Sequence, residues 1–125
     1  MDETTWKTTL AALAAGEPAD DATLIAFVTG DLVHGFGREA MDPVQYGDAW
    51  LRVLDHGPAF GAPSIDALLE LAARTPSGEA MRSLVTVLRS ALSDDELARR
   101  VSALASAAEP RRRAAGDALA YWIQS

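Results

Sequence analysis

Three helical segments joined by very short connections, between Ser64 and Ala108, constrain the fold of this chain more than any other feature of its sequence. In the middle segment, apolar residues recur at the three- and four-residue spacing of one helix face. They are Met81, Leu84, Val85, Leu88 and Leu92. We therefore expect residues 77–92, which we call the spine helix, to bury their apolar face against the helices directly before and after it.

The boundaries of these segments follow from local signals. Thr75-Pro76 and Glu109-Pro110 end one helix and allow the next to begin. Ser77 is a predicted N-cap of the spine helix, and Ser93 with Glu96 forms a capping box for the helix after it. Because these connections are so short, successive helices are expected to be near-antiparallel neighbours.

The first half of the chain has helical patterns over residues 4–15, 20–34 and 42–56. We expect Gly16, Gly35 and Gly57 to end these helices in the left-handed conformation that glycine adopts easily. Asp42 followed by proline is typical of a helix start. The third helix carries apolar residues at Val44, Gly47, Trp50, Leu51 and Leu54, and Ser64 is the predicted N-cap of a fourth helix.

These patterns predict an all-α protein of about seven helices, either a compact bundle or a short right-handed α-solenoid with helical-hairpin, HEAT-like stacking. The solenoid alternative rests on a weak repeat, in which residues 76–92 align with 110–125 at an offset of 34. A chain of 125 residues is long enough to bury its own core. We expect one domain over 1–125, with an acidic, irregular half (1–62) and a regular antiparallel half (63–125).

The charge of the chain is unevenly distributed. Residues 1–62 contain ten acids against three bases, which accounts for the formal net charge of −7, whereas residues 63–125 contain eight acids and eight arginines. An acidic first half disfavours binding of nucleic acid or of an anionic membrane. We therefore expect another protein as partner, with a homodimer as an open alternative and no membrane partner.

The location predicted from the sequence is cytoplasmic. No apolar run approaches the ~20 residues that span a bilayer. The first ten residues carry acids where a signal peptide has positive charge. The chain has no cysteine, which excludes disulfides, thiolate metal sites and cysteine nucleophiles.

One short segment, residues 35–40 (GFGREA), matches the dinucleotide-binding fingerprint G-x-G-x-x-G/A. Asp55 lies about 20 residues further on, where a ribose-binding acid is expected. The fingerprint also needs a strand before the glycines and a long helix after them, but Pro43 interrupts that helix. We therefore interpret the segment as a glycine-rich loop, and predict no cofactor and no metal.

The two histidines occur in similar sequence motifs, Leu-Val-His34-Gly and Leu-Asp-His56-Gly. In one interpretation each imidazole only lies at the negative end of a helix. In the other, His34 and His56 converge with Asp31 and Asp55 to form a ligand or acid–base site. That site requires both helix ends to share one pole of the molecule, which sequence alone does not decide.

Candidate interface residues are of two kinds. The aromatic candidates are Phe36 and Phe60, in glycine-flanked loops, and Tyr121. A phenylalanine in such a loop either contacts a partner or tucks the loop onto the core. The basic candidates are Arg111, Arg112 and Arg113, which with Arg99 and Arg100 form an arginine cluster over 99–113.

The arginine cluster is expected to pair internally, since Asp95, Glu96 and Glu109 lie four residues before Arg99, Arg100 and Arg113. Nucleic acid or an acidic partner is the alternative ligand of this cluster. The motifs of serine hydrolases, P-loop proteins, zinc proteases and calcium loops are absent, so no catalytic residue is predicted. The sequence therefore favours a non-catalytic helical interaction module (adaptor, immunity-type, regulatory or accessory). The alternative is a small enzyme or ligand-binding subunit with a pocket near His34 and His56.

Overall fold

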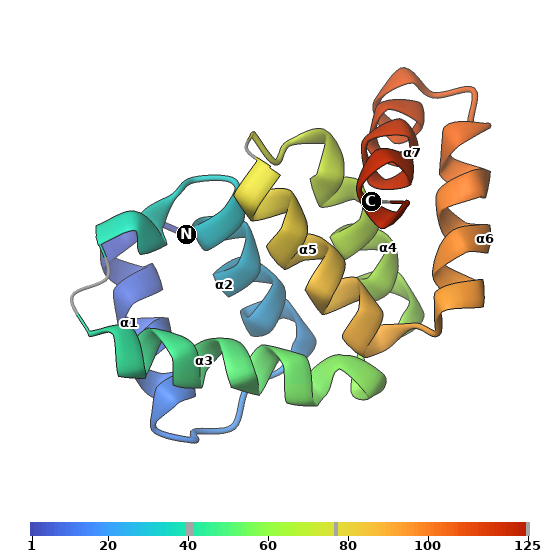
Figure 1. Cartoon of the computed structure of the whole chain (residues 1–125). Coiled ribbons are helices and arrows are strands. Elements are labelled where there is room, and N and C mark those ends of the chain that lie inside the picture. Colours follow the sequence, from blue (N-terminus) through green and yellow to red (C-terminus); the bar gives the residue numbers. More distant parts are fainter. Residues whose placement is uncertain (40–41, 77, 125) are drawn as a thin grey trace.

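A computed structural model describes residues 1–39, 42–76 and 78–124 and contains, in these ranges, seven α-helices and three short 3₁₀ helices (Figure 1). The α-helices are α1 (Glu3–Ala14), α2 (Asp21–Leu32), α3 (Pro43–His56), α4 (Ala62–Glu70), α5 (Gly78–Ala91), α6 (Asp94–Ala105) and α7 (Pro110–Ile123). The 3₁₀ helices are η1 (Phe36–Glu39), η2 (Gly57–Ala59) and η3 (Leu71–Ala73). The predicted all-α fold is confirmed.

Side-chain caps explain where several of these helices begin. Asp2, Asp20, Asp42 and Ser93 each accept a hydrogen bond from a backbone N–H in the first turn of the helix that follows, at N···O distances of 2.7–3.2 Å. The predicted starts at Asp42-Pro43 and Ser93 are thus confirmed. The predicted N-cap Ser77 lies outside the described residues.

Two local predictions were wrong. The fourth helix begins at Ala62 with Gly61 as its N-cap, and the Ser64 hydroxyl instead donates to Asp21. Gly16 and Gly35 have the predicted positive φ, +82° and +72°, but Gly57 is right-handed at φ −42° and continues into η2. Gly57 is needed for a different reason, since a Cβ there would lie 2.6 Å from the Ser90 backbone.

The spine helix α5 crosses the middle of the molecule, with α1 and α3 on one side of it and α6 and α7 on the other (Figure 1). Its predicted apolar face is buried at Met81, Leu84, Val85 and Leu88, and Val87 is buried as well. The preceding helix α4 packs against α5 as predicted, but α2, α3, η2 and α7 do so too, and the following helix α6 covers little of its surface. The buried apolar residues of both halves form one continuous core.

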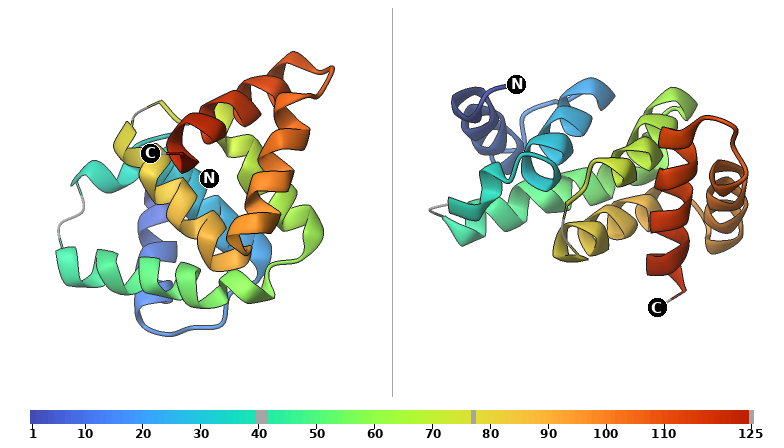
Figure 2. Two further views of the ribbon diagram at one scale, coloured as in Figure 1. Left: turned by 45° about the vertical axis from the view of Figure 1, so that its right-hand side comes forward. Right: turned by 90° about the horizontal axis from the view of Figure 1, so that it is seen from above.

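Helices α6 and α7 pack against each other, as their short connection predicts, and they lie at the opposite end of the molecule from α1 (Figure 2). They are not antiparallel as predicted, because α7 is seen along its length from above whereas α6 is seen nearly end-on (Figure 2). They approach closely at Gly116, where a Cβ would lie 2.2 Å from the backbone nitrogen of Ala105. The arrangement is a compact helical bundle, and a solenoid is not confirmed.

Helix α3 buries a face that the sequence pattern does not single out. Ala49 and Val53 are fully buried, and Trp50 and Leu54 are half-buried. Val44 and Leu51, which the pattern groups with Trp50 and Leu54, are 71% and 57% exposed. Apolar residues therefore lie on several sides of α3, and two of them, Val44 and Leu51, face solvent.

Candidate functional site

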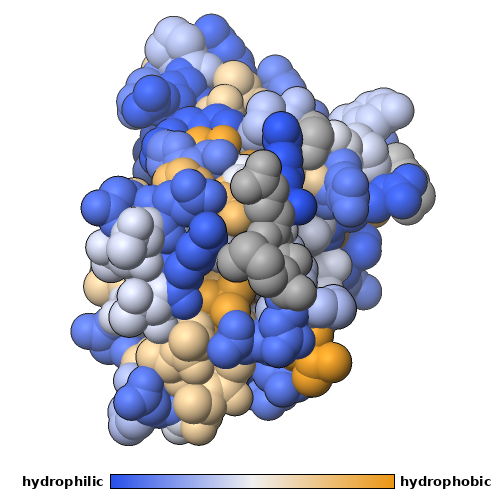
Figure 3. Space-filling view, turned by 90° about the vertical axis from the view of Figure 1, so that its left-hand side faces the viewer, coloured by the Kyte–Doolittle hydropathy of each residue, from blue (hydrophilic) through white to orange (hydrophobic). Residues whose placement is uncertain are grey.

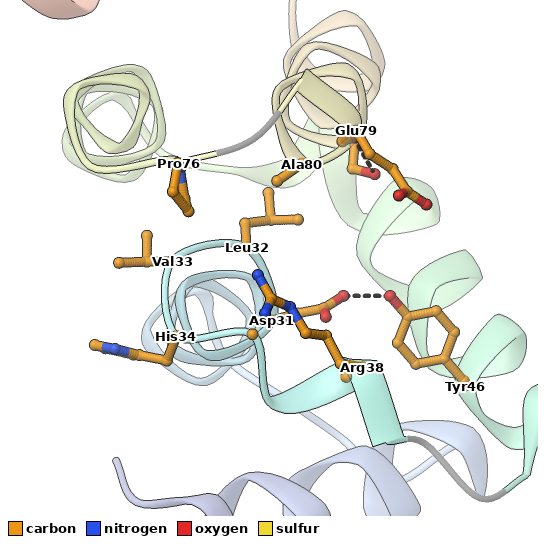
Figure 4. A pocket seen from close by; sticks show the side chains of 12 residues that line it. Asp31, Leu32, Val33, His34, Arg38, Tyr46, Pro76, Glu79 and Ala80 are labelled. Carbon is orange, nitrogen blue, oxygen red and sulfur yellow. Dashed lines mark hydrogen bonds between the residues drawn. The ribbon is translucent and has the colours of Figure 1, made fainter.

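A hollow of about 490 Å³ lies between the end of α2, η1, the start of α3 and the start of α5. Its charged and polar lining side chains are Asp31, His34, Arg38, Tyr46, Glu79 and Ser83. Figure 4 shows the Asp31–Tyr46 pair in the centre, with the Arg38 side chain overlapping Asp31 in this view and Glu79 on the neighbouring helix α5. The His34 ring points outward, away from this pair.

The Asp31 carboxylate is held by two donors from α3. The Tyr46 hydroxyl and the Trp50 indole N–H, the latter at 2.8 Å, both donate to Asp31 Oδ2. Burial raises the pKa of Tyr46, and its hydrogen bond to Asp31 raises it further. The phenol therefore stays protonated, and its oxygen keeps a lone pair for a ligand in the hollow.

The segment Gly35-Phe-Gly37 builds one wall of this hollow. Gly35 ends α2 in the left-handed conformation, and Gly37 lies so close to Asp31 that a Cβ would be 2.2 Å from Asp31 Oδ1. A helix, α2, precedes these glycines where the dinucleotide fingerprint requires a strand. The glycines therefore serve close packing rather than dinucleotide binding, and the segment predicted to be a loop contains the 3₁₀ helix η1.

The four residues of the candidate acid–base site do not converge. His34 lies just beyond the C-terminal end of α2, stacked on Phe36 at 5.4 Å between ring centroids, whereas His56 Nε2 is 2.7 Å from Asp21 Oδ1 at the N-terminal end of α2. The 13 residues from Asp21 to His34 correspond to roughly 20 Å of helix. Only Asp31 and His34 line the hollow, and Asp55 is exposed near the end of α3.

A second polar cluster, which sequence reasoning missed, surrounds Asp21. Its Oδ1 contacts His56, and its Oδ2 accepts from the Ser64 hydroxyl at 2.7 Å and from the Gly61 backbone N–H at 3.0 Å. The hydrogen bonds from Gly61, Ser64 and His56 lower the pKa of Asp21 to about 2. No local pattern reveals this cluster, because Asp21 is 35 to 43 residues from its partners.

The Asp21 cluster contains an acid, a histidine and a serine, but not in the order that activates a nucleophile. In a catalytic triad the serine donates to the histidine, and the histidine is oriented by the acid. Here Ser64 and His56 both contact Asp21. The cluster therefore ties the start of α2 to the segment between α3 and α4 and has a structural role.

The aromatic interface candidates differ in exposure. Phe60 is buried, with its ring 4.7 Å from the His56 ring, and Phe36 is half-buried with its ring 6.2 Å from the Trp6 ring. Of the two interpretations, Phe60 follows the one in which the phenylalanine tucks its loop onto the core, and Phe36 does so in part. Tyr121 is 68% exposed on α7.

Ion pairs occupy much of the arginine cluster. Glu96 binds both Arg99 and Arg100, Arg100 also contacts Asp66 at 3.1 Å, and Arg112 lies 3.6 Å from Glu70. The expected Glu96–Arg100 pair is confirmed, and Arg99 pairs with Glu96 rather than with Asp95. Arg111, Arg112 and Arg113 are exposed in the first turn of α7, eight to ten residues before Tyr121. They therefore form no common patch with that tyrosine.

A smaller hollow of about 340 Å³ lies between α5 and α7, lined by Arg82, Val85, Thr86, Arg89 and Trp122. Arg82 lies over the Trp122 ring at 5.7 Å, and Arg89 contacts Asp94 and the backbone oxygen of Ile123. Both arginines are therefore engaged by neighbouring groups of the same chain.

Two apolar residues on the outer side of α3, Val44 and Leu51, are exposed, which the sequence pattern did not predict. Val44 and Leu51 lie seven residues apart, which places them on one helix face, and the exposed Asp48 and Asp55 share that face. We call these four residues the α3 outer face. Figure 3 shows the end of the molecule that carries α1 and the start of α3: it is mostly hydrophilic, with separate apolar patches.

Within the described ranges, no three acidic or histidine side chains are placed to hold a metal ion together. No helix in those ranges is long and apolar enough to cross a membrane. Comparison with protein-family models, with curated proteins and with solved structures finds no match to this chain.

Proposed function

We propose that this protein is a non-catalytic interaction module that binds a basic, amphipathic segment of another cytoplasmic protein through the α3 outer face. The observation that carries the proposal is the exposure of Val44 and Leu51, at 71% and 57%, on one face of a regular helix. Large aliphatic side chains exposed in register provide an anchor for an apolar partner, although isolated exposed ones are common on protein surfaces.

The charge of the α3 outer face indicates the chemistry of the partner. Asp48 and Asp55 alternate with the two apolar residues along the helix, and all the negative excess of the chain lies in residues 1–62. A partner segment with lysine or arginine beside apolar residues complements both features, whereas an acidic segment is repelled.

Photo-crosslinking in the native host tests this proposal. A photoreactive amino acid replaces Asp48, between Val44 and Leu51, and a matched control carries it at the exposed Ser102 on α6. We expect position 48 to capture a segment in which lysine or arginine flanks apolar residues, and the Val44→Ser, Leu51→Ser double variant to lower the yield at least about tenfold.

Three outcomes would overturn the proposal: no crosslink specific to position 48, capture of an acidic segment, or a yield that the double variant leaves unchanged. Capture of a second copy of this chain through its own α3 would show a homodimer instead. Small-molecule binding is a second candidate function, and the hollow beside Asp31 favours it.

A further inference from the structure

We propose that the hollow beside Asp31 binds a small zwitterion, a molecule such as a free amino acid that carries both an ammonium and a carboxylate group. This inference is independent of the α3 outer face, which lies on exposed α3 residues that do not line the hollow.

The first support is the size and the position of the hollow. About 490 Å³ is within the range of small-molecule pockets, which is about 300–1,000 Å³. Four elements meet there, and the lining comes from the end of α2, η1, the start of α3 and the start of α5. A ligand in this space would contact segments that are far apart in the sequence.

The second support is that two oppositely charged wall groups, Arg38 and Glu79, have no ion-pair partner within the described ranges, whereas the third, Asp31, already accepts hydrogen bonds from Tyr46 and Trp50. Arg38, from η1, and Glu79, from α5, both line the hollow (Figure 4). Among the described residues, neither the Arg38 guanidinium nor the Glu79 carboxylate forms an ion pair. A ligand of a single charge complements only one of these groups, whereas a zwitterion complements both.

The third support is the rigidity of the wall around Asp31. Asp31 is held by Tyr46 and Trp50, and Gly37 packs directly against it. The Tyr46 hydroxyl donates to Asp31, so its oxygen can accept a hydrogen bond from a ligand ammonium beside Glu79. The Arg38 guanidinium then faces the ligand carboxylate, with the paired donor geometry that suits this group.

Binding measurements with matched ligands test this assignment. The twenty standard L-amino acids are titrated singly into the full chain and followed by NMR and calorimetry. Each amino acid that binds is compared with its N-acetyl derivative, which lacks the ammonium, and its amide, which lacks the carboxylate. We expect at least one amino acid to bind, and each derivative to bind at least about tenfold more weakly.

Variants locate the site. We expect Arg38→Gln to weaken binding of the intact amino acid more than that of its amide, and Glu79→Gln to weaken it more than that of its N-acetyl derivative. Arg82→Gln, at the smaller hollow on the same helix as Glu79, is the control and should leave the affinity within about twofold. The Val44→Ser, Leu51→Ser variant should also bind normally, which separates this site from the proposed partner surface.

The proposal is wrong if none of the twenty amino acids binds with a Kd below about 10 mM. It is equally wrong if the derivatives bind as well as the intact amino acids, because recognition would not then require both charges. Binding that survives both Arg38→Gln and Glu79→Gln would place the ligand elsewhere.

Discussion

Single glycines control how closely the helices of this protein approach. A Cβ at Gly116 would lie 2.2 Å from the backbone of Ala105, whereas a Cβ at Gly47 on α3 meets nothing within 4 Å. A helix backbone cannot yield as a flexible side chain does. The two positions therefore separate the effect of close packing from the intrinsic helix propensity of glycine.

We expect Gly116→Ala to lower the free energy of unfolding by about 1–3 kcal/mol, because it forces α6 and α7 apart. Gly47→Ala should raise it by about 0.5–1 kcal/mol, because alanine loses less backbone entropy in a helix. Urea denaturation of both variants measures the difference. Equal effects at the two positions would show that the α6 and α7 backbones are not in close contact at Gly116.

The Asp21 cluster predicts an acid-sensitive contribution to stability. The pKa of Asp21 is about 2 in the folded protein and 3.8 for an unperturbed carboxyl, so the ionised form is favoured by folding. This contribution is fully present above about pH 4 and is lost as the pH falls toward 2.

Unfolding of wild type and of Asp21→Asn between pH 2 and pH 6 measures this contribution. We expect the wild type to be the more stable at pH 6, and the difference to shrink below pH 4. Asp55→Asn, at an exposed carboxylate on α3, is the matched control and should show a much smaller change. A difference for Asp21→Asn that is constant over this range would contradict the assignment.

At the scale of elements, the spine helix depends on a face covered by helices from both halves. Leu88 is fully buried there, and Thr86 is exposed on the same helix. Leu88→Ala should cost about 2–5 kcal/mol through lost burial and a cavity, and Leu88→Asp should cost more by burying an unpaired carboxylate. Thr86→Ala should change stability by less than about 0.5 kcal/mol. If thermal denaturation shows that Leu88→Ala is about as stable as the wild type, the face of α5 that carries Leu88 does not face the core.

At the scale of the whole molecule, both halves share one core through α5, which packs on α2 and α3 and also on α4 and α7. Loss of this helix would expose buried side chains in both halves. We therefore predict one cooperative unfolding transition, with coincident urea curves from far-UV circular dichroism and from tryptophan fluorescence. Two separate transitions would show that residues 1–62 and 63–125 fold independently.

Several predictions from the sequence depend on neighbouring residues alone, and these agree with the structure. Asp42-Pro43 and Ser93 begin helices because a side-chain oxygen reaches an amide two or three residues away. Gly16 and Gly35 adopt positive φ for a similarly local reason. The buried face of α5 follows from the helical period, because its polar side is strongly marked by Arg82, Thr86 and Arg89.

The part of the site that sequence reasoning found, Asp31 and His34, is close in the chain, whereas Arg38, Tyr46 and Glu79 were not recognised. Their convergence depends on how α2, α3 and α5 cross, and no pattern within one helix encodes a crossing angle.

The amino-acid sequence by itself determined the all-α class and several helix starts and ends, since these follow from hydrogen bonds and periodicity over a few residues. Only the tertiary structure decided which residues of α3 face water, which helices cover α5, and that His56 meets Asp21 rather than His34. These outcomes depend on side-chain packing between segments tens of residues apart, and the free energy of that packing is not a property of any one segment.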